Sequence, residues 1–176
     1  MRIVIDIRTI SDHFPGISRY TYDLACALGR QVEMDELILL SNPALANDRF
    51  DIGAIASGSK VRIAHTTARP FTLWEQMHLP GELRAIKPGI IHFPYPVLPY
   101  AAKRPVVISI HDIIPLRLPR YFSLRDRILY RIALSLALRK ADWVLCPSEA
   151  TIEDIQSAFP MISTRLIRAP GGVGAS

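Results

Sequence analysis

Short apolar runs alternate with helical patterns along almost the whole chain, and this alternation constrains the fold more than any other feature of the sequence. Seven runs rich in valine, isoleucine and leucine are expected to form strands, at residues 3–7, 36–41, 60–64, 89–93, 105–110, 143–146 and 164–168. Nearly every residue of these runs is apolar, which is what burial of a strand on both faces requires. Strands that alternate with helices predict a parallel sheet covered on both sides.

The segments between the runs carry helical spacing and one clear start signal. Apolar residues recur at helical spacing from Ile17 to Arg30. Thr72 and Glu75 form a capping box before a helix expected to end near Ile86. Pro80-Gly81 predicts that this helix kinks or restarts there. Residues 43–59 are expected to be loop with at most a short helix.

Two more helix starts lie in the second half of the chain. Ser123 and Asp126 form a capping box before a predicted helix at 124–140, and Ser148 is the expected N-cap of a helix that ends near Ala158. The predicted fold class is therefore α/β, with a Rossmann-like parallel sheet of about seven strands and helices on both faces.

The length allows one domain with a sizeable core. The chain has 176 residues, of which 49% are hydrophobic and 21% charged, and this is too short for two ordinary domains. No boundary is visible before residue 168. Residues 1–168 are predicted to form one domain, and residues 169–176, which include Pro170-Gly171-Gly172, are predicted to begin a linker.

Cysteine usage and the first residues favour a cytoplasmic chain. Cys26 and Cys146 lie in apolar segments without a C-x-x-C pair, which favours two buried free thiols over a disulfide or a metal pair. No signal peptide is visible, and no run approaches the ~20 apolar residues of a membrane span. Peripheral contact with the inner face of the cell membrane stays open.

The charge balance favours anionic partners. The net charge of +5 fits nucleotides, phospholipid headgroups or nucleic acid without choosing among them. In the helix at 124–140, a narrow polar stripe recurs every four residues, at Arg127, Arg131, Ser135 and Arg139. This pattern predicts a largely buried helix with a solvated edge. The alternative is a basic amphipathic helix that touches an anionic membrane.

Ligands of open α/β sheets bind beyond the carboxyl ends of the strands, so the loops that begin near Arg8, Phe93, His111 and Pro147 are the candidates. Gly16, just before the first helix, predicts an anion site of exposed backbone N–H groups; the alternative is a simple turn. The motifs G-x-G-x-x-G and G-x-x-x-x-G-K-[ST] are absent, which disfavours NAD and ATP.

Three other loops carry polar or aromatic candidates. Tyr95 and Tyr100 could stack on a sugar or pack against the domain. His111, followed by Asp112, could hydrogen-bond or deprotonate a hydroxyl, or could be structural. Ser148 is expected to cap a helix. No metal site is expected, because the remaining histidines lack ligand spacing: His13, His65, His78 and His92.

Several motifs, in order, resemble those of family 4 glycosyltransferases, especially the bacterial mannosyltransferase-like members. These are M-R-I-V-I-D-I-R, P-G-I-S-R-Y-T-Y-D-L, L-W-E-Q-M-H-L-P, H-F-P-Y-P-V-L-P and H-D-I-I-P-L-R-L-P-R-Y-F-S. The resemblance continues through Y-R-I-A-L-S-L-A-L-R-K-A-D-W-V-L-C-P-S-E-A-T. The closing R-L-I-R-A-P-G-G-V is similar to the family's I-x-P-N-G-V hinge, with Gly171 in place of the usual asparagine.

The resemblance implies the N-terminal half of a GT-B fold, in which two Rossmann-like domains face each other. It implies that Gly16 lies near the donor phosphates or the transferred sugar and that His111 projects toward the reacting sugar. Ser148 and Glu149 match the family's serine segment. Arg19, Tyr95 and Asp112 lie in matched motifs and complete the set of substrate-binding candidates.

The expected function is the acceptor-binding half of a retaining hexosyltransferase. It would use a nucleotide sugar, with mannose as the candidate sugar and a glycan or lipid-linked saccharide as acceptor. The resemblance implies no metal and no other cofactor, and no nucleic-acid partner is expected. The family's donor-binding domain would follow residue 176, so the chain alone is expected to be inactive. The alternative is a non-catalytic saccharide-binding or partner-interaction module.

Overall fold

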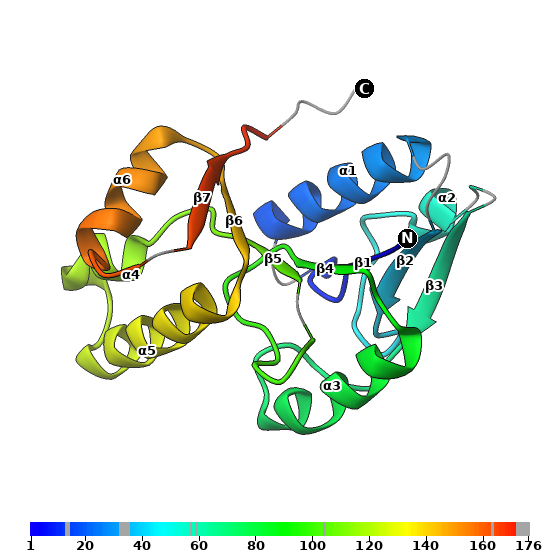
Figure 1. Ribbon diagram of the computed structural model, residues 1–176, viewed down its shortest axis with the longest axis horizontal. Helices are drawn as coiled ribbons and strands as arrows, with labels where there is room; N and C mark the ends of the chain where they lie inside the picture. The colour runs from blue at the N-terminus through cyan, green and yellow to red at the C-terminus, as the bar shows by residue number, and fades with distance from the viewer. Residues whose placement is uncertain are drawn as a thin grey trace.

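The computed structural model describes residues 1–12, 15–31, 36–56, 58, 60–103, 105–162 and 164–171, and shows one twisted sheet between two layers of helices (Figure 1). All seven strands are parallel, in the order β3-β2-β1-β4-β5-β6-β7. They are β1 (Arg2–Asp6), β2 (Glu36–Ser41), β3 (Val61–His65), β4 (Ile90–Phe93), β5 (Val106–Ser109), β6 (Trp143–Cys146) and β7 (Arg165–Arg168). The predicted fold class is confirmed, and each predicted strand lies within one residue of an observed one.

The two faces of the sheet bury separate cores. Helices α1 (Pro15–Gln31) and α2 (Ile52–Ala56) cover one face through Ala25 and Ile55, which pack on alternate residues of β1 and β2. Helices α3 (Leu73–Ile86), α5 (Leu124–Lys140) and α6 (Glu149–Ala158) cover the other face. Their largest buried contributions are Leu79, Leu83, Leu134, Leu138, Ile152 and Ile155. Side chains that alternate across each strand explain why the strands are apolar at nearly every position.

The three predicted N-caps are confirmed. The hydroxyl oxygens of Thr72, Ser123 and Ser148 accept hydrogen bonds from the backbone N–H groups three residues later, at 3.2, 3.1 and 3.2 Å. These caps satisfy N–H groups that the first turn of a helix leaves without partners. Helix α2 is the short helix expected within residues 43–59.

Of the two predictions at Pro80-Gly81, a restart of the helix is wrong, and a kink stays a prediction. Helix α3 runs from Leu73 to Ile86 with Pro80 inside it. A proline inside a helix costs roughly 3 kcal/mol. Pro80 is buried between Leu79 and Leu83, and packing of this face on the sheet offsets the missing hydrogen bond.

Two short elements between β5 and α5 were not predicted. They are α4 (Ile114–Arg117) and the 3-10 turn η1 (Pro119–Tyr121). Each has a proline in its first turn, Pro115 and Pro119, where a missing N–H is harmless. These two prolines are the sequence signal that could have predicted the starts of the two elements.

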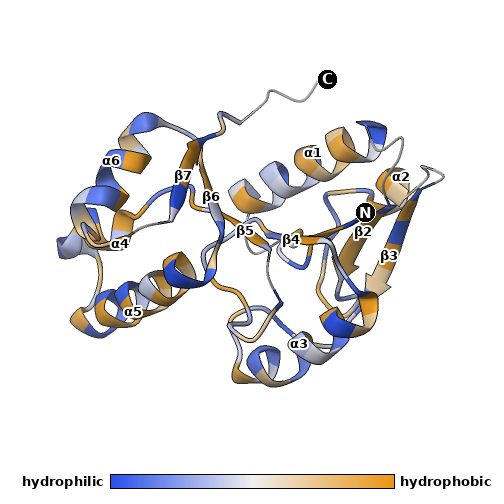
Figure 2. Cartoon of the chain, in the orientation of Figure 1, coloured by the Kyte–Doolittle hydropathy of each residue, from blue (hydrophilic) through white to orange (hydrophobic). Residues whose placement is uncertain are grey.

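The predicted burial of α5 is wrong. Only Leu134, Ala137 and Leu138 are buried. Hydrophobic and hydrophilic positions both appear along α5 in Figure 2, and several large apolar side chains on this helix are exposed. These three residues belong to the core on one face of the sheet, so only one side of α5 meets the core.

The described part of the chain ends just beyond β7. Strand β7 ends at Arg168, where the predicted domain ends, and the predicted linker is described only as far as Gly171. Residues 172–176 lie outside the described residues. Both cysteines are free, with Cys146 buried and Cys26 half-buried. Among the described helices, none combines the length and apolar character needed to cross a bilayer.

Candidate functional site

The candidate loops meet at one edge of the sheet. Strands β1, β4, β5 and β6 are consecutive neighbours, so the loops that follow their carboxyl ends lie side by side. Strand order reverses between β1 and β4, because the chain runs outward to β3 and then returns to the other side of β1. Such a switch point leaves a crevice at the carboxyl ends of the strands, where ligands of this architecture bind.

A buried ion-pair network fixes the start of the first loop. The Arg8 guanidinium donates from Nε to Asp6 Oδ1 at 2.8 Å and from Nη2 to Glu75 Oε1 at 2.6 Å, and it reaches the Ala68 carbonyl from Nη1 at 3.0 Å. The side chains of Arg8, Asp6 and Glu75 are completely buried. Burial disfavours the charged guanidinium, but the neighbouring carboxylates outweigh it and raise the pKa of Arg8. The network ties β1 to the first turn of α3.

Tyr95 belongs to this network and does not face a ligand. Its ring is fully buried, and its hydroxyl donates to Asp6 Oδ2 at 2.5 Å and accepts from Arg8 Nη2 at 3.0 Å. Burial raises its pKa well above 10.0, so the hydroxyl stays protonated and remains a donor. Of the two alternatives for Tyr95, stacking on a sugar is wrong and packing against the domain is confirmed. Tyr100 also packs inward, with its hydroxyl toward the Ala133 carbonyl at 3.4 Å.

His111 follows β5 and stands half-buried beside the loop that follows β4, one strand from the switch point. Its Nε2 lies 3.2 Å from the carbonyl oxygen of Pro94, which follows β4. A carbonyl can only accept, so Nε2 carries the proton and Nδ1 keeps its lone pair. Burial lowers the pKa of His111, so the imidazole is neutral at pH 7. The side chain is therefore oriented by the backbone and offers an acceptor nitrogen.

Three polar residues beneath His111 were not predicted. The Ser109 hydroxyl lies 2.9 Å from His92 Nε2 and 3.0 Å from the Tyr20 hydroxyl. The Tyr20 ring meets the His111 ring edge-on, with 4.6 Å between centroids. This chain joins α1, β4 and β5 under the candidate site. Tyr20 lies four residues after Gly16, on the same side of the helix, and that spacing is the signal that could have indicated it.

The burial of His92 predicts a stability change between pH 6.5 and pH 4. Desolvation, with a smaller effect of His111, lowers the pKa of His92 from 6.5 to about 4. Below pH 6.5 the unfolded chain binds a proton that the folded chain excludes, so stability falls as the pH falls toward 4. We expect this histidine to lower the free energy of unfolding by on the order of 2–3 kcal/mol between pH 6.5 and pH 4.

The variant His92→Gln isolates that contribution. Its side-chain amide can keep the hydrogen bond to Ser109 but does not titrate. Urea unfolding at pH 7, 5.5 and 4.5 should show a shallower pH dependence for His92→Gln than for the parent chain. Parallel curves would contradict the assignment, because all other titrating groups are common to the two proteins.

Gly16 and Arg19 lie on the exposed side of the first turns of α1. An added Cβ at Gly16 would meet nothing within 4 Å, and its φ is not positive, so packing does not require glycine there. Its backbone lies at the N-terminus of a 17-residue helix, where N–H groups and the helix dipole favour an anion. Arg19 Nε donates to Asp23 Oδ2 at 2.8 Å in an exposed i,i+4 pair.

Asp112, Ser148 and Glu149 shape the neighbouring loops. Asp112 Oδ1 accepts from the Ile114 N–H at 3.0 Å, and its carbonyl accepts from the Tyr130 hydroxyl at 3.1 Å. Its carboxylate therefore serves the turn into α4. Ser148 caps α6 as predicted, and Glu149 is exposed in the first turn of that helix. The edge thus brings together His111, Tyr20 and the start of α1, with Ser148 and Glu149 on the adjacent loop.

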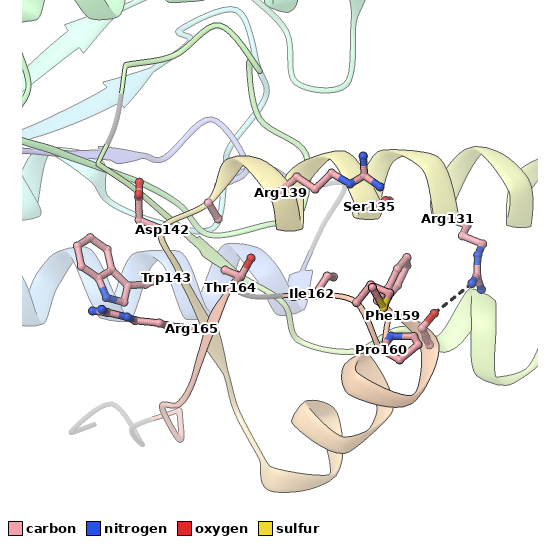
Figure 3. Close-up of a pocket in the computed structure, with 13 residues that line it drawn as sticks. Arg131, Ser135, Arg139, Asp142, Trp143, Phe159, Pro160, Ile162, Thr164 and Arg165 are labelled. Carbon is pink, nitrogen blue, oxygen red and sulfur yellow. Dashed lines mark hydrogen bonds between the residues drawn. The ribbon is translucent and has the colours of Figure 1, made fainter.

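Cavities also lie elsewhere on the domain. One of about 590 Å³ opens between α5, α6 and the amino ends of β6 and β7, at the opposite edge of the sheet. In Figure 3 its arginines, Arg131, Arg139 and Arg165, surround this space, and Arg131 donates to the Ala158 carbonyl at 3.0 Å. A second cavity, of about 440 Å³, lies beyond β1, β2 and β3 and includes Asn42, Asn47 and His65. Within the described ranges, no group of three or more His, Cys, Asp or Glu side chains could hold a metal ion.

Comparison with known proteins gives one family. The model for Glycosyltransferase Family 4 matches residues 15–175. The match extends from the start of α1 through β7 and so includes His111, Ser148 and Glu149. A search of the curated proteins finds no match.

Proposed function

The chain belongs to glycosyltransferase family 4, and from that premise we propose that it forms the acceptor side of the active site of a retaining enzyme. The enzyme would move a sugar, with mannose as the candidate, from a nucleotide sugar to a glycan or a lipid-linked saccharide. The observation that carries the proposal is the orientation of His111 at the carboxyl edge of the sheet, next to the first turns of α1.

The chemistry of His111 suits a sugar hydroxyl. A neutral imidazole whose Nε2–H is held by the Pro94 carbonyl presents Nδ1 as an acceptor, and the lowered pKa keeps it neutral at pH 7. An acceptor nitrogen can orient a hydroxyl and take its proton as the glycosidic bond forms. The Tyr20 ring limits the rotation of the imidazole from one side.

The leaving diphosphate needs positive potential. We propose that the first turn of α1 at Gly16 supplies part of it through backbone N–H groups, without a metal ion. Arg8, the only cation at the start of this loop, is fully buried in its own ion pairs and cannot reach a phosphate. The remaining positive charge would come from a second, donor-binding domain, so we expect the 176-residue chain alone to transfer no sugar.

Isotope-edited NMR of the 176-residue chain tests the proposal. A mannose-terminated oligosaccharide should shift the backbone amides of Gly16, Tyr20 and His111, and no sugar transfer should occur when a panel of nucleotide sugars is added. The variant Gly16→Ala adds a methyl group into open space, so it should keep full stability while weakening any response to nucleotide sugars.

Two outcomes would contradict the proposal. Shifts confined to the cavities away from the carboxyl edge of the sheet would place saccharide binding elsewhere. Turnover of a nucleotide sugar by the chain alone would show that no second domain is needed.

A further inference from the structure

More than half of the exposed large apolar side chains among the described residues lie in one segment. Fifteen large apolar side chains are exposed among the described residues, and eight of them lie between Ile114 and Leu136. They are Ile114, Leu118, Tyr121, Leu124, Ile128, Leu129, Ile132 and Leu136. Together with the exposed arginines Arg120, Arg125, Arg131 and Arg139, we call them the α5 surface. Clusters of this kind on a folded domain mark a surface that meets something other than water.

The geometry of α5 aligns these side chains. Leu124, Ile128, Ile132 and Leu136 are spaced four residues apart and form one row along the solvent side of the helix, opposite the buried Leu134 and Ala137. The Tyr130 hydroxyl, bound to the Asp112 carbonyl, holds α5 against the start of α4. The α5 surface is therefore a continuation of the loop that carries His111.

The positive charge of the protein is concentrated in the same segment. Residues 118–140 contain six of the 21 basic residues and one of the 16 acidic residues, which leaves fifteen of each in the rest of the chain. The whole net charge of +5 thus belongs to this segment. Arg120, Arg125, Arg131 and Arg139 are exposed, and the Arg120 guanidinium lies over the Tyr121 ring at 4.8 Å.

Apolar side chains interleaved with arginines fit one partner better than others. Arginine is common in protein interfaces, so the arginines alone do not exclude a protein partner. A protein partner would have to place acidic side chains opposite each exposed arginine along the row. An anionic bilayer accepts apolar side chains at the level of the acyl boundary while arginines reach the phosphates of the headgroups. Arg131 and Arg139 also line the cavity of Figure 3, so cationic side chains border the apolar row on that flank.

We propose that the α5 surface docks onto the anionic headgroup layer of a membrane, with α5 in the plane of the interface. The evidence for docking comes from the α5 surface alone and does not depend on the proposed function. Its use, which is to bring a lipid-linked acceptor to His111, rests on the proposed function. Ile114 is three residues from His111, so a membrane that contacts the α5 surface lies next to the carboxyl edge of the sheet.

Vesicle co-sedimentation of the 176-residue chain tests the docking. Vesicles of phosphatidylcholine with about one third phosphatidylglycerol should bind the chain at least tenfold more tightly than pure phosphatidylcholine, and high salt should reverse the binding. The variant Arg120→Gln/Arg125→Gln should weaken binding about 30-fold, given about 1 kcal/mol per basic residue at such a surface. Ile128→Ser/Ile132→Ser should weaken it at least tenfold.

Matched variants elsewhere on the chain serve as controls. Leu73→Ser/Met77→Ser removes two side chains of α3 that are 83% and 75% exposed, and Arg84→Gln/Lys103→Gln removes two exposed charges. Both should bind anionic vesicles like the parent chain. His111→Ala should also bind like the parent, which separates docking from transfer.

Three results would overturn the proposal. The first is equal binding to neutral and anionic vesicles, or no binding to either. The second is an equal loss of binding in the α3 controls. The third is a concentration-dependent dimer, detected by sedimentation without vesicles, that the Ile128→Ser/Ile132→Ser variant abolishes, because the α5 surface would then pair two copies of the chain.

Discussion

Replacing His111 by alanine should slow sugar transfer by a factor of about 10²–10⁴ in the catalytically competent protein, which is the usual contribution of a positioned proton acceptor. Stability should change little, because His111 is half-buried and makes one hydrogen bond to a backbone carbonyl, worth about 1 kcal/mol. Initial rates at saturating donor and acceptor, with urea unfolding of the same samples, give both quantities.

Two variants serve as controls for the His111 experiment. Asp112→Asn removes the charge of the next side chain but keeps an oxygen that can accept from the Ile114 N–H, and should leave the rate within a few-fold of the parent. Tyr20→Phe removes the hydroxyl bound to Ser109 but keeps the ring against His111. Its transfer rate should therefore lie between those of Asp112→Asn and His111→Ala. A fully active His111→Ala protein would show that the His111 side chain takes no part in sugar transfer.

Replacing Arg8 by leucine should lower the free energy of unfolding by about 3–5 kcal/mol, the cost of removing one partner of a buried ion pair. Leucine would leave the carboxylates of Asp6 and Glu75 fully buried without a cation. Chemical denaturation at pH 7 measures the loss. Arg19→Leu is the control, because the exposed Arg19–Asp23 pair should contribute no more than about 0.5 kcal/mol.

The pH dependence of the Arg8→Leu variant provides a second test. Burial raises the pKa of Glu75 even with Arg8 present, and removal of the guanidinium should raise it further. A carboxyl group with a raised pKa takes up its proton at higher pH in the folded chain than in the unfolded chain. The deficit of Arg8→Leu relative to the parent should therefore shrink as the pH falls from 7 toward 4. A deficit no larger than that of Arg19→Leu would show that the network does not stabilise the fold.

The sequence determined the seven strands and the longer helices to within a few residues. The seven apolar runs, the capping residues Thr72, Ser123 and Ser148 and the alternation of strand and helix are local signals, since each depends on side-chain periodicity or on a hydrogen bond three residues away. The rule that ligands bind at the carboxyl ends of parallel strands then selected the candidate edge and the loop of His111. These predictions needed no knowledge of which helix packs where.

The tertiary structure decided which residues face the solvent and which pack in the core. Tyr95 looked available for a sugar, but Asp6 and Arg8, almost 90 positions away, bind its hydroxyl in the core. Pro80 continues α3 because packing on the sheet compensates for a lost hydrogen bond. Tyr20, Ser109 and His92 converge beneath His111 because β4 and β5 are neighbours of each other and of α1.

Helix α5 shows most clearly the difference between what local sequence signals predict and what tertiary packing decides. Its sequence is apolar over most of the circumference, and composition alone predicts burial. Only one face of the helix reaches the sheet, so an apolar row with arginines is left outside. Sequence periodicity fixes which residues share a face, because that is local geometry. Which face is covered depends on neighbours that are distant in the chain, and only the folded structure contains that information.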